Sequence, residues 1–185
     1  MSEVAIEDRF AANLDVLSQA ILTYITEVRK QGVNIIQPEL VQAATLFIRG
    51  YNHVSLIEGF IGNTHDSCWE HIRTRNEVHF VQNSEAIFKQ VPVAQVNLLK
   101  QLFEAKDANG QSVITPVMKQ QIWTLLDNLV KGSIKYVHHA RGPKIVKQNG
   151  MDVKTYSNAE KFSFVNLPYH IEKWGMAKTL SWPTI

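Results

Sequence analysis

The densest group of chemically useful side chains lies between His65 and His79. It contains His65, Asp66, Cys68, Glu70, His71, Arg73, Arg75, Glu77 and His79. Cys68 and His71 are three positions apart, so on a helix they share a face, as zinc ligands do. A structural zinc ion needs four ligands, and the chain has one cysteine. His138 or His139 would have to complete the site from elsewhere, and only one can serve because adjacent helical positions point about 100° apart. We therefore assign no metal ligand and expect no cofactor.

The same stretch suggests a Cys–His hydrolase or transferase. A thiol near a helix N-terminus has a lowered pKa, and His71 is close enough to Cys68 in the sequence to act as its base. Such a pair also needs an orienting group and an oxyanion hole, for which the sequence has no local signature. Phosphate-binding glycine patterns and a Ser/His/Asp signature are absent as well. We assign no catalytic residue, and an enzyme or metal protein built on His65–His79 stays an alternative.

The simplest interpretation of His65–His79 is a charged amphipathic helix. This interpretation predicts buried side chains at Trp69, Ile72 and Phe80. It predicts ion pairs or contact with water for Arg73, Arg75 and Glu77.

Basic side chains form a second group, between Asn128 and Met151. This stretch has no Asp or Glu and contains Lys131, Lys135, Arg141, Lys144 and Lys147. Because the whole chain has 19 Lys and Arg against 17 Asp and Glu, the remainder is mildly acidic. Aromatic and imidazole groups at Tyr136, His138 and His139 accompany the cations, a combination that suits phosphate contacts and base stacking. Cations are also favoured near a helix C-terminus by the helix dipole alone. We expect an anion- or partner-binding surface, and leave an acidic protein and nucleic acid open as partners.

A long amphipathic helix must carry the basic group. Thr115 supplies an N-cap hydroxyl and Pro116 a first-turn proline, so we expect the helix to begin there and to run to about Arg141, with Gly142-Pro143 ending it. Its apolar spacing makes it the expected central helix.

The first helix, from about Ala5 to Gln31, has an apolar seam with a period of 3.5 residues. The seam consists of Phe10, Leu14, Leu17, Ile21, Tyr24 and Val28. It packs either inside a bundle or against a second chain. We name these six residues, together with Trp182 near the C-terminus, as candidates for self-association.

The remaining elements follow from caps, prolines and glycines. We expect a helix from Pro38 to about Ile61 that Gly50 kinks or ends, followed by a break at Gly62–Thr64. Further helices are expected from Ser67 to about Val81, from Asn83, from Val93 to Phe103 and from Pro168 to Met176. Val153–Val165 is expected to form a hairpin or an irregular arm. The predicted fold is all-α, an irregular bundle of about six helices in residues 1–150, with a C-terminal arm in residues 151–185 packed on the bundle or on a partner.

Composition predicts an intracellular protein, in the cytoplasm or the nucleus. One cysteine fits a reducing compartment, the N-terminus has no signal-peptide pattern, and no apolar run approaches the roughly 20 residues that span a bilayer.

Two strings carry a resemblance. They are His65 to Phe80, continued by Asn83 and Ile87-Phe88, and Val130 to Pro143. They resemble small helical proteins encoded by large DNA viruses of eukaryotes, over roughly Leu56 to Pro143. The resemblance implies a virion or virus-factory protein with a scaffolding or interaction role.

We therefore expect a non-enzymatic structural or interaction protein, with another protein or a second copy as partner. Helix faces would build the contact and the basic group would orient it by charge. A nucleic-acid-binding module with weak sequence preference is the first alternative, and the enzyme described above is the second.

Overall fold

The computed structural model describes residues 4–32, 38–65, 67–87, 93–141, 144–155, 161–178 and 180. Its elements in chain order are α1 (Ile6–Lys30), α2 (Pro38–Gly50), α3 (His53–Thr64), α4 (Ser67–Arg73), α5 (Glu77–Gln82), α6 (Ser84–Ile87), α7 (Val93–Glu104), α8 (Pro116–Arg141), β1 (Lys144–Gln148), β2 (Met151–Thr155) and α9 (Leu167–Lys173). The all-α prediction with an irregular arm is confirmed. Eight helices are described in residues 1–150, where about six were expected, because two of the expected helices are each divided in two; the ninth, α9, belongs to the arm.

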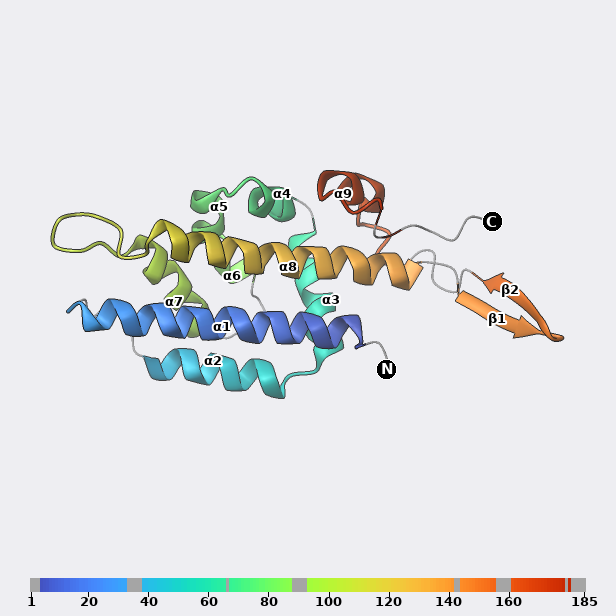
Figure 1. Ribbon diagram of the computed structural model, residues 1–185, viewed down its shortest axis with the longest axis horizontal. Coiled ribbons are helices and arrows are strands. Elements are labelled where there is room, and N and C mark those ends of the chain that lie inside the picture. The colour runs from blue at the N-terminus through green and yellow to red at the C-terminus, as the bar shows by residue number, and fades with distance from the viewer. Residues whose placement is uncertain are drawn as a thin grey trace.

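The long helix α8 is central, as its apolar spacing predicts. It lies antiparallel to α1, while α2 and α3 pack on α1 from other sides (Figure 1). Leu126, Leu129 and Ile134 of α8 are fully buried. Burying each such side chain contributes about 1.5–3 kcal/mol, so the buried face of α8 contributes strongly to the stability of the core.

The starts of α2 and α8 confirm the cap predictions. Pro38 and Pro116 are the first residues of their helices. The Thr115 hydroxyl accepts the backbone N–H of Met118 at 3.2 Å, which satisfies one of the four N–H groups that a helix start leaves without a partner. Gly32 follows α1 with φ at 84°, the left-handed conformation that we expect of a glycine at a helix end.

The predicted break at Gly62–Thr64 is wrong. Helix α3 continues through Gly62 to Thr64, and the backbone N–H of His65 still donates to the Ile61 carbonyl at 3.0 Å. A helical glycine costs about 1 kcal/mol relative to alanine, which packing of the neighbouring Phe60 and Ile61 offsets.

The single helix predicted from Ser67 to Val81 is also wrong. Helix α4 ends at Arg73 and α5 begins at Glu77, and between them Arg75 adopts φ of 57°. The chain turns at this point, so α4 contacts α8 while α5 contacts α4 and α7.

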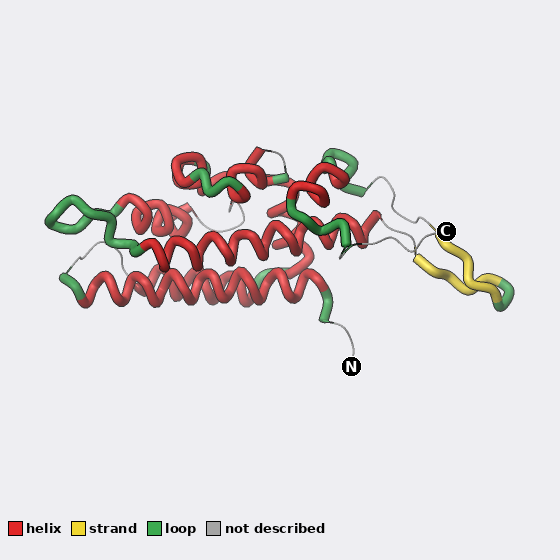
Figure 2. The backbone as a smooth tube through the Cα atoms, turned by 45° about the horizontal axis from the view of Figure 1, so that its top comes forward, coloured by secondary structure: helices red, strands yellow, loops and turns green. Residues whose placement is uncertain are grey.

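The strands lie earlier in the chain than predicted. β1 and β2 pair antiparallel through a turn at Asn149 and Gly150, both with positive φ, and Lys147 is in register with Asp152. The hairpin extends away from the helices in both views, and the main contacts of each strand are with the other strand (Figures 1 and 2). The predicted domain boundary at residue 150 falls in this turn.

The C-terminal arm packs on the helical body. Val165, Leu167 and Met176 are buried, and α9 contacts α8. Among the described residues, none of the helices is long and apolar enough to cross a membrane.

Candidate functional site

The His65–His79 stretch folds into a structural cluster at the α4–α5 junction. Trp69, Ile72 and Phe80 are buried, as predicted. The Trp69 indole N–H donates to the Thr64 hydroxyl at 2.7 Å, and that hydroxyl donates to the Phe60 carbonyl at 2.6 Å. These hydrogen bonds tie α4 to the end of α3.

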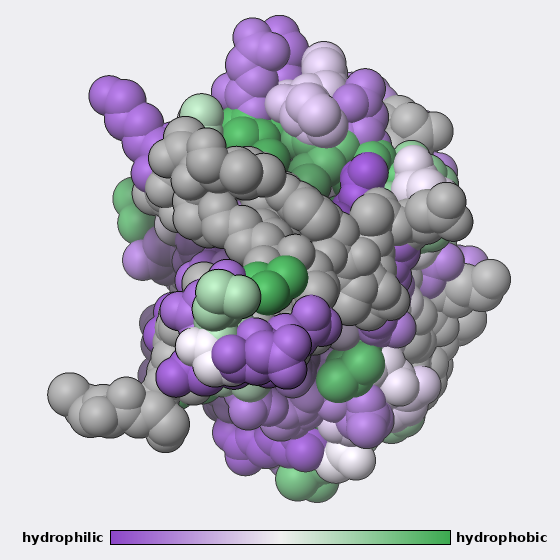
Figure 3. Space-filling view, turned by 90° about the vertical axis from the view of Figure 1, so that its right-hand side faces the viewer, coloured by the Kyte–Doolittle hydropathy of each residue, from purple (hydrophilic) through white to green (hydrophobic). Residues whose placement is uncertain are grey.

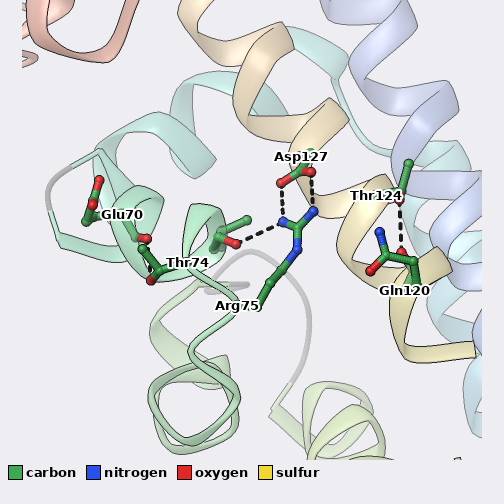
Figure 4. A network of polar contacts seen from close by, with 7 residues as sticks. Glu70, Thr74, Arg75, Gln120, Thr124 and Asp127 are labelled. Atoms are coloured by element: carbon green, nitrogen blue, oxygen red, sulfur yellow. Dashed lines mark hydrogen bonds and ion pairs between the residues drawn. The ribbon is translucent and has the colours of Figure 1, made fainter. Parts of the chain in front are cut away.

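The charged residues of this stretch form ion pairs, which also confirms the prediction. Arg73 pairs with Glu70, and Glu77 with Lys119 of α8 at 3.0 Å. Arg75 donates to both carboxylate oxygens of Asp127 at 2.6 Å each and to the Ile72 carbonyl at 3.0 Å. Figure 4 shows how Arg75 reaches from the α4–α5 linker to α8.

Two imidazoles stack at this junction. The rings of His71 and His79 lie 3.7 Å apart with 21° between their planes. Asn76 Oδ1 accepts the backbone N–H of His79 at 3.2 Å, so the amide nitrogen of Asn76 faces His71 Nδ1 at 2.9 Å and donates to it. Asn83 Nδ2 donates to the His79 carbonyl at 2.8 Å and lies 3.4 Å from His79 Nδ1. Burial, and next the charge of His71, lower the pKa of His79.

Cys68 does not have the environment of a reactive thiol. Its side chain is buried, and burial raises the pKa of the thiol to about 12. A thiol with this pKa stays protonated at neutral pH and is a poor nucleophile and metal ligand. His71, its expected base, is hydrogen-bonded to Asn76 instead. No group of three or more His, Cys, Asp or Glu side chains that could hold a metal ion occurs within the described ranges.

The basic residues differ in how far they are exposed. Lys131 on α8 and Lys147 on β1 are exposed, whereas Lys135 and Arg141 are half-buried. Arg141 donates to the Val165 carbonyl at 3.3 Å and so holds the C-terminal arm. The side chain of Lys144 lies outside the described part. His138, one of the groups expected beside the cations, is buried, and burial and next the charge of His139 lower its pKa.

Tyr136 also helps to hold the C-terminal arm on the helical body, through a shared contact with Glu58. Its hydroxyl donates to Glu58 of α3 at 2.8 Å, and Lys161 donates to the same carboxylate oxygen at 2.9 Å. Burial, helped by the Glu58 charge, raises the pKa of Tyr136. Burial acts to raise the pKa of Glu58, but the hydrogen bonds from Lys161 and Tyr136 outweigh it and lower this pKa.

The apolar seam of α1 lies inside the chain. Its members Phe10, Leu14, Leu17, Ile21, Tyr24 and Val28 are each at most 9% exposed. α1 packs chiefly on α8 and α2, and the Phe10 ring lies 5.4 Å from that of Phe60. The chain's own helices cover the seam, as in the first of the two alternatives, packing inside a bundle. Trp182, the other candidate for self-association, lies outside the described residues.

An exposed apolar groove runs beside the seam, between α1 and α8. It has an open volume of about 380 Å³ and is lined by Val16, Ala20, Tyr24, Gln120, Gln121, Thr124 and Leu125. Val16 is 50% exposed, Ala20 and Leu125 are half-buried, and the Tyr24 hydroxyl donates to Gln121 at the floor. We refer to this surface as the α1–α8 groove. The sequence signal for it was Val16 and Ala20, an apolar pair four positions apart on the flank of the seam.

The end of the molecule that carries the hairpin presents a mixed surface. Figure 3 shows hydrophilic side chains over most of its described part, with separate smaller hydrophobic areas. One exposed apolar side chain near the hairpin turn is Met151, which is 69% exposed.

Comparisons with protein-family models, with curated proteins and with solved structures find no match to this chain.

Proposed function

We propose that this is a non-enzymatic structural or interaction protein that holds a protein partner in the α1–α8 groove. The groove itself is the observation that carries the proposal. It combines a mostly apolar lining, an exposed valine and walls from two antiparallel helices, features that receive an amphipathic helix in many recognition grooves. Val117, which is 67% exposed, extends the apolar surface at the start of α8.

The environment of the titratable groups supports a role without catalysis. The Cys68 thiol is protonated, His71 and His79 receive hydrogen bonds from asparagine amides, and Arg75 is paired with Asp127. These groups stabilise the junction of α4 and α5. The resemblance of two segments to proteins of large DNA viruses favours a virion or scaffold component as the biological context.

A site-specific photo-crosslinker tests the proposal. We replace Val16 with benzoylphenylalanine and irradiate cells that make the protein. The matched control carries the same group at Val78, a valine of α5 that is 65% exposed and lies outside the groove. We expect a covalent adduct of defined mass from position 16 and none from position 78. The adduct should be lost when Leu125→Lys places a charge in the groove. Equal labelling at both positions, or no adduct at position 16, contradicts the proposal.

Nucleic-acid binding is a second candidate function, favoured by the hairpin. β1 and β2 extend from the body at the basic end of α8, and Lys147 on β1 and Lys131 on α8 are exposed. A fluorescent DNA duplex titrated at several salt concentrations tests this candidate. If these two lysines contact phosphates, the double variant K131E/K147E should reduce the slope of log K against log [salt] by about two. Lys178→Glu, another exposed lysine, is the control. A weak response without salt dependence excludes this function.

A further inference from the structure

We infer that the partner in the α1–α8 groove is a second copy of this chain. In this arrangement the α1 helices of the two copies lie antiparallel across a two-fold axis. The inference rests on the proposed function and adds the identity of the partner.

The exposed stripe of α1 is symmetric about its own centre. Val16 and Ala20 line the groove. Arg9 lies seven positions before Val16, and Glu27 lies seven positions after Ala20. Since seven residues make almost two helical turns, all four belong to the same stripe. Arg9 and Glu27 are exposed.

A two-fold axis between Val16 and Ala20 brings complementary groups together. It places Val16 opposite Ala20 of the partner subunit, so that a larger apolar side chain meets a small one and the helices can approach closely. The same axis places Arg9 opposite Glu27 of the partner subunit. Symmetry repeats each contact, which gives two apolar contacts and two ion pairs. A parallel arrangement would instead bring the two Arg9 side chains together and is disfavoured.

Charges near the groove agree with the antiparallel direction. Lys131 of α8 lies seven positions after the groove residue Thr124 and is exposed. Because α8 runs antiparallel to α1 (Figure 1), Lys131 lies toward the same end of the two helices as Arg9. Arg9 forms no ion pair within the described part of the chain. Glu27 pairs with Lys30 at 3.3 Å, and both side chains are largely exposed. Such surface pairs contribute about 0–1 kcal/mol, so Glu27 can exchange Lys30 for an arginine of the partner subunit.

Sedimentation equilibrium of the full chain tests the inference, because it measures association while the charges of Arg9 and Glu27 are reversed singly and together. We expect the average mass of the wild type to rise with concentration toward twice 21.0 kDa. R9E and E27R each place like charges opposite one another at two symmetric positions, so each should weaken association roughly tenfold. The double variant R9E/E27R restores opposite charges and should restore association. R29E carries the same charge change on an exposed residue of α1 outside the stripe, and it should associate like the wild type.

The outcomes separate this inference from the proposed function. A monomer at every concentration, or a double variant that stays as weak as the single ones, overturns the second copy as partner. In that case an adduct between position 16 and a different protein would still support the proposed interaction function. If the crosslinking experiment gives no groove-specific adduct either, both proposals fail. Circular dichroism melting curves of all variants show whether each one is folded.

Discussion

Single side chains at the α4–α5 junction owe their chemistry to burial. Cys68 is 8% exposed, and burial raises the pKa of its thiol to about 12. From the sequence a thiolate was an alternative, because a thiol near a helix N-terminus can have a lowered pKa. The difference arises from packing that the sequence does not display: Cys68 belongs to the core cluster, as do Trp69 and Ile72.

The accessibility of Cys68 gives the first prediction. At pH 7.5 the folded protein should react with a disulfide reagent such as 5,5′-dithiobis(2-nitrobenzoate) at least about a hundred times more slowly than the protein in 8 M urea, because only an accessible thiolate reacts. Absorbance at 412 nm measures both rates. Equal rates in the folded and unfolded states would show a reactive thiol and would favour the enzymatic alternative.

The lowered pKa of His79 gives a pH prediction. A histidine whose pKa is lower in the folded state binds more protons when the chain unfolds. The free energy of unfolding should therefore fall as the pH drops below the unfolded value of about 6.5, and level off below the folded pKa. Urea titrations between pH 7.5 and 5 measure this slope. His79→Gln should make the slope shallower, with His138, whose pKa is also lowered, supplying part of the remainder. An unchanged slope would contradict the assignment to His79.

At the scale of elements, helix starts could be read from the sequence. Pro38 and the Thr115-Pro116 pair begin their helices as predicted, since a cap hydroxyl and a proline act within one turn of the chain. The α1 seam was predicted as well, but the sequence did not decide whether helices of the same chain or a second chain would cover it. The structure shows that α2 and α8 cover it, and α8 lies far along the chain. The α1–α8 groove was not predicted, because it exists only where these two helices meet.

The α4–α5 reversal could not be predicted from local sequence. Arg75 is an unfavourable residue for a left-handed conformation, and no glycine marks the turn. The ion pair that fixes it comes from Asp127, 52 positions along the chain. The hairpin, in contrast, had a local signal that was missed: Asn149-Gly150 is the most favoured pair for a two-residue hairpin turn.

The Arg75–Asp127 pair predicts a loss of stability at this reversal. Arg75→Ala removes a two-point ion pair and the hydrogen bond to the Ile72 carbonyl, and it leaves Asp127, 19% exposed, without its cation. We expect the free energy of unfolding to fall by about 1.5–3 kcal/mol in urea titrations. Lys30→Ala, which removes the exposed pair with Glu27, is the control and should change stability by less than about 1 kcal/mol. Similar effects of both substitutions would argue against the role given to Arg75.

At the scale of the whole molecule, the C-terminal arm and the hairpin differ in how they join the body. The arm is held by the Glu58–Lys161 pair, by Arg141 and by buried Leu167. The hairpin lies between the body and the arm in sequence but extends away from both (Figure 1). An isolated two-stranded hairpin is at best marginally stable, so it should contribute little to the stability of the fold.

This contrast gives a prediction for thermal unfolding. Replacing Lys144–Thr155 by a Gly/Ser linker should change the Tm by less than about 3 °C. Leu167→Ala, which removes a buried side chain of the arm, should cost about 2–3 kcal/mol and lower the Tm by about 5–10 °C. Differential scanning calorimetry measures both. A large drop in Tm for the linker variant would show that the hairpin packs on the body.

The pairing of α1 with α8 also affects how the chain is made. α1 leaves the ribosome well before α8, which covers much of its seam and begins only at Pro116. Translation at roughly 5–20 residues per second leaves α1 waiting on the order of 10 seconds for this neighbour. During that interval a helix-length apolar surface is available to other nascent chains and to chaperones. We expect ribosome-bound intermediates of this protein to be most sensitive to proteases and aggregation just before α8 emerges.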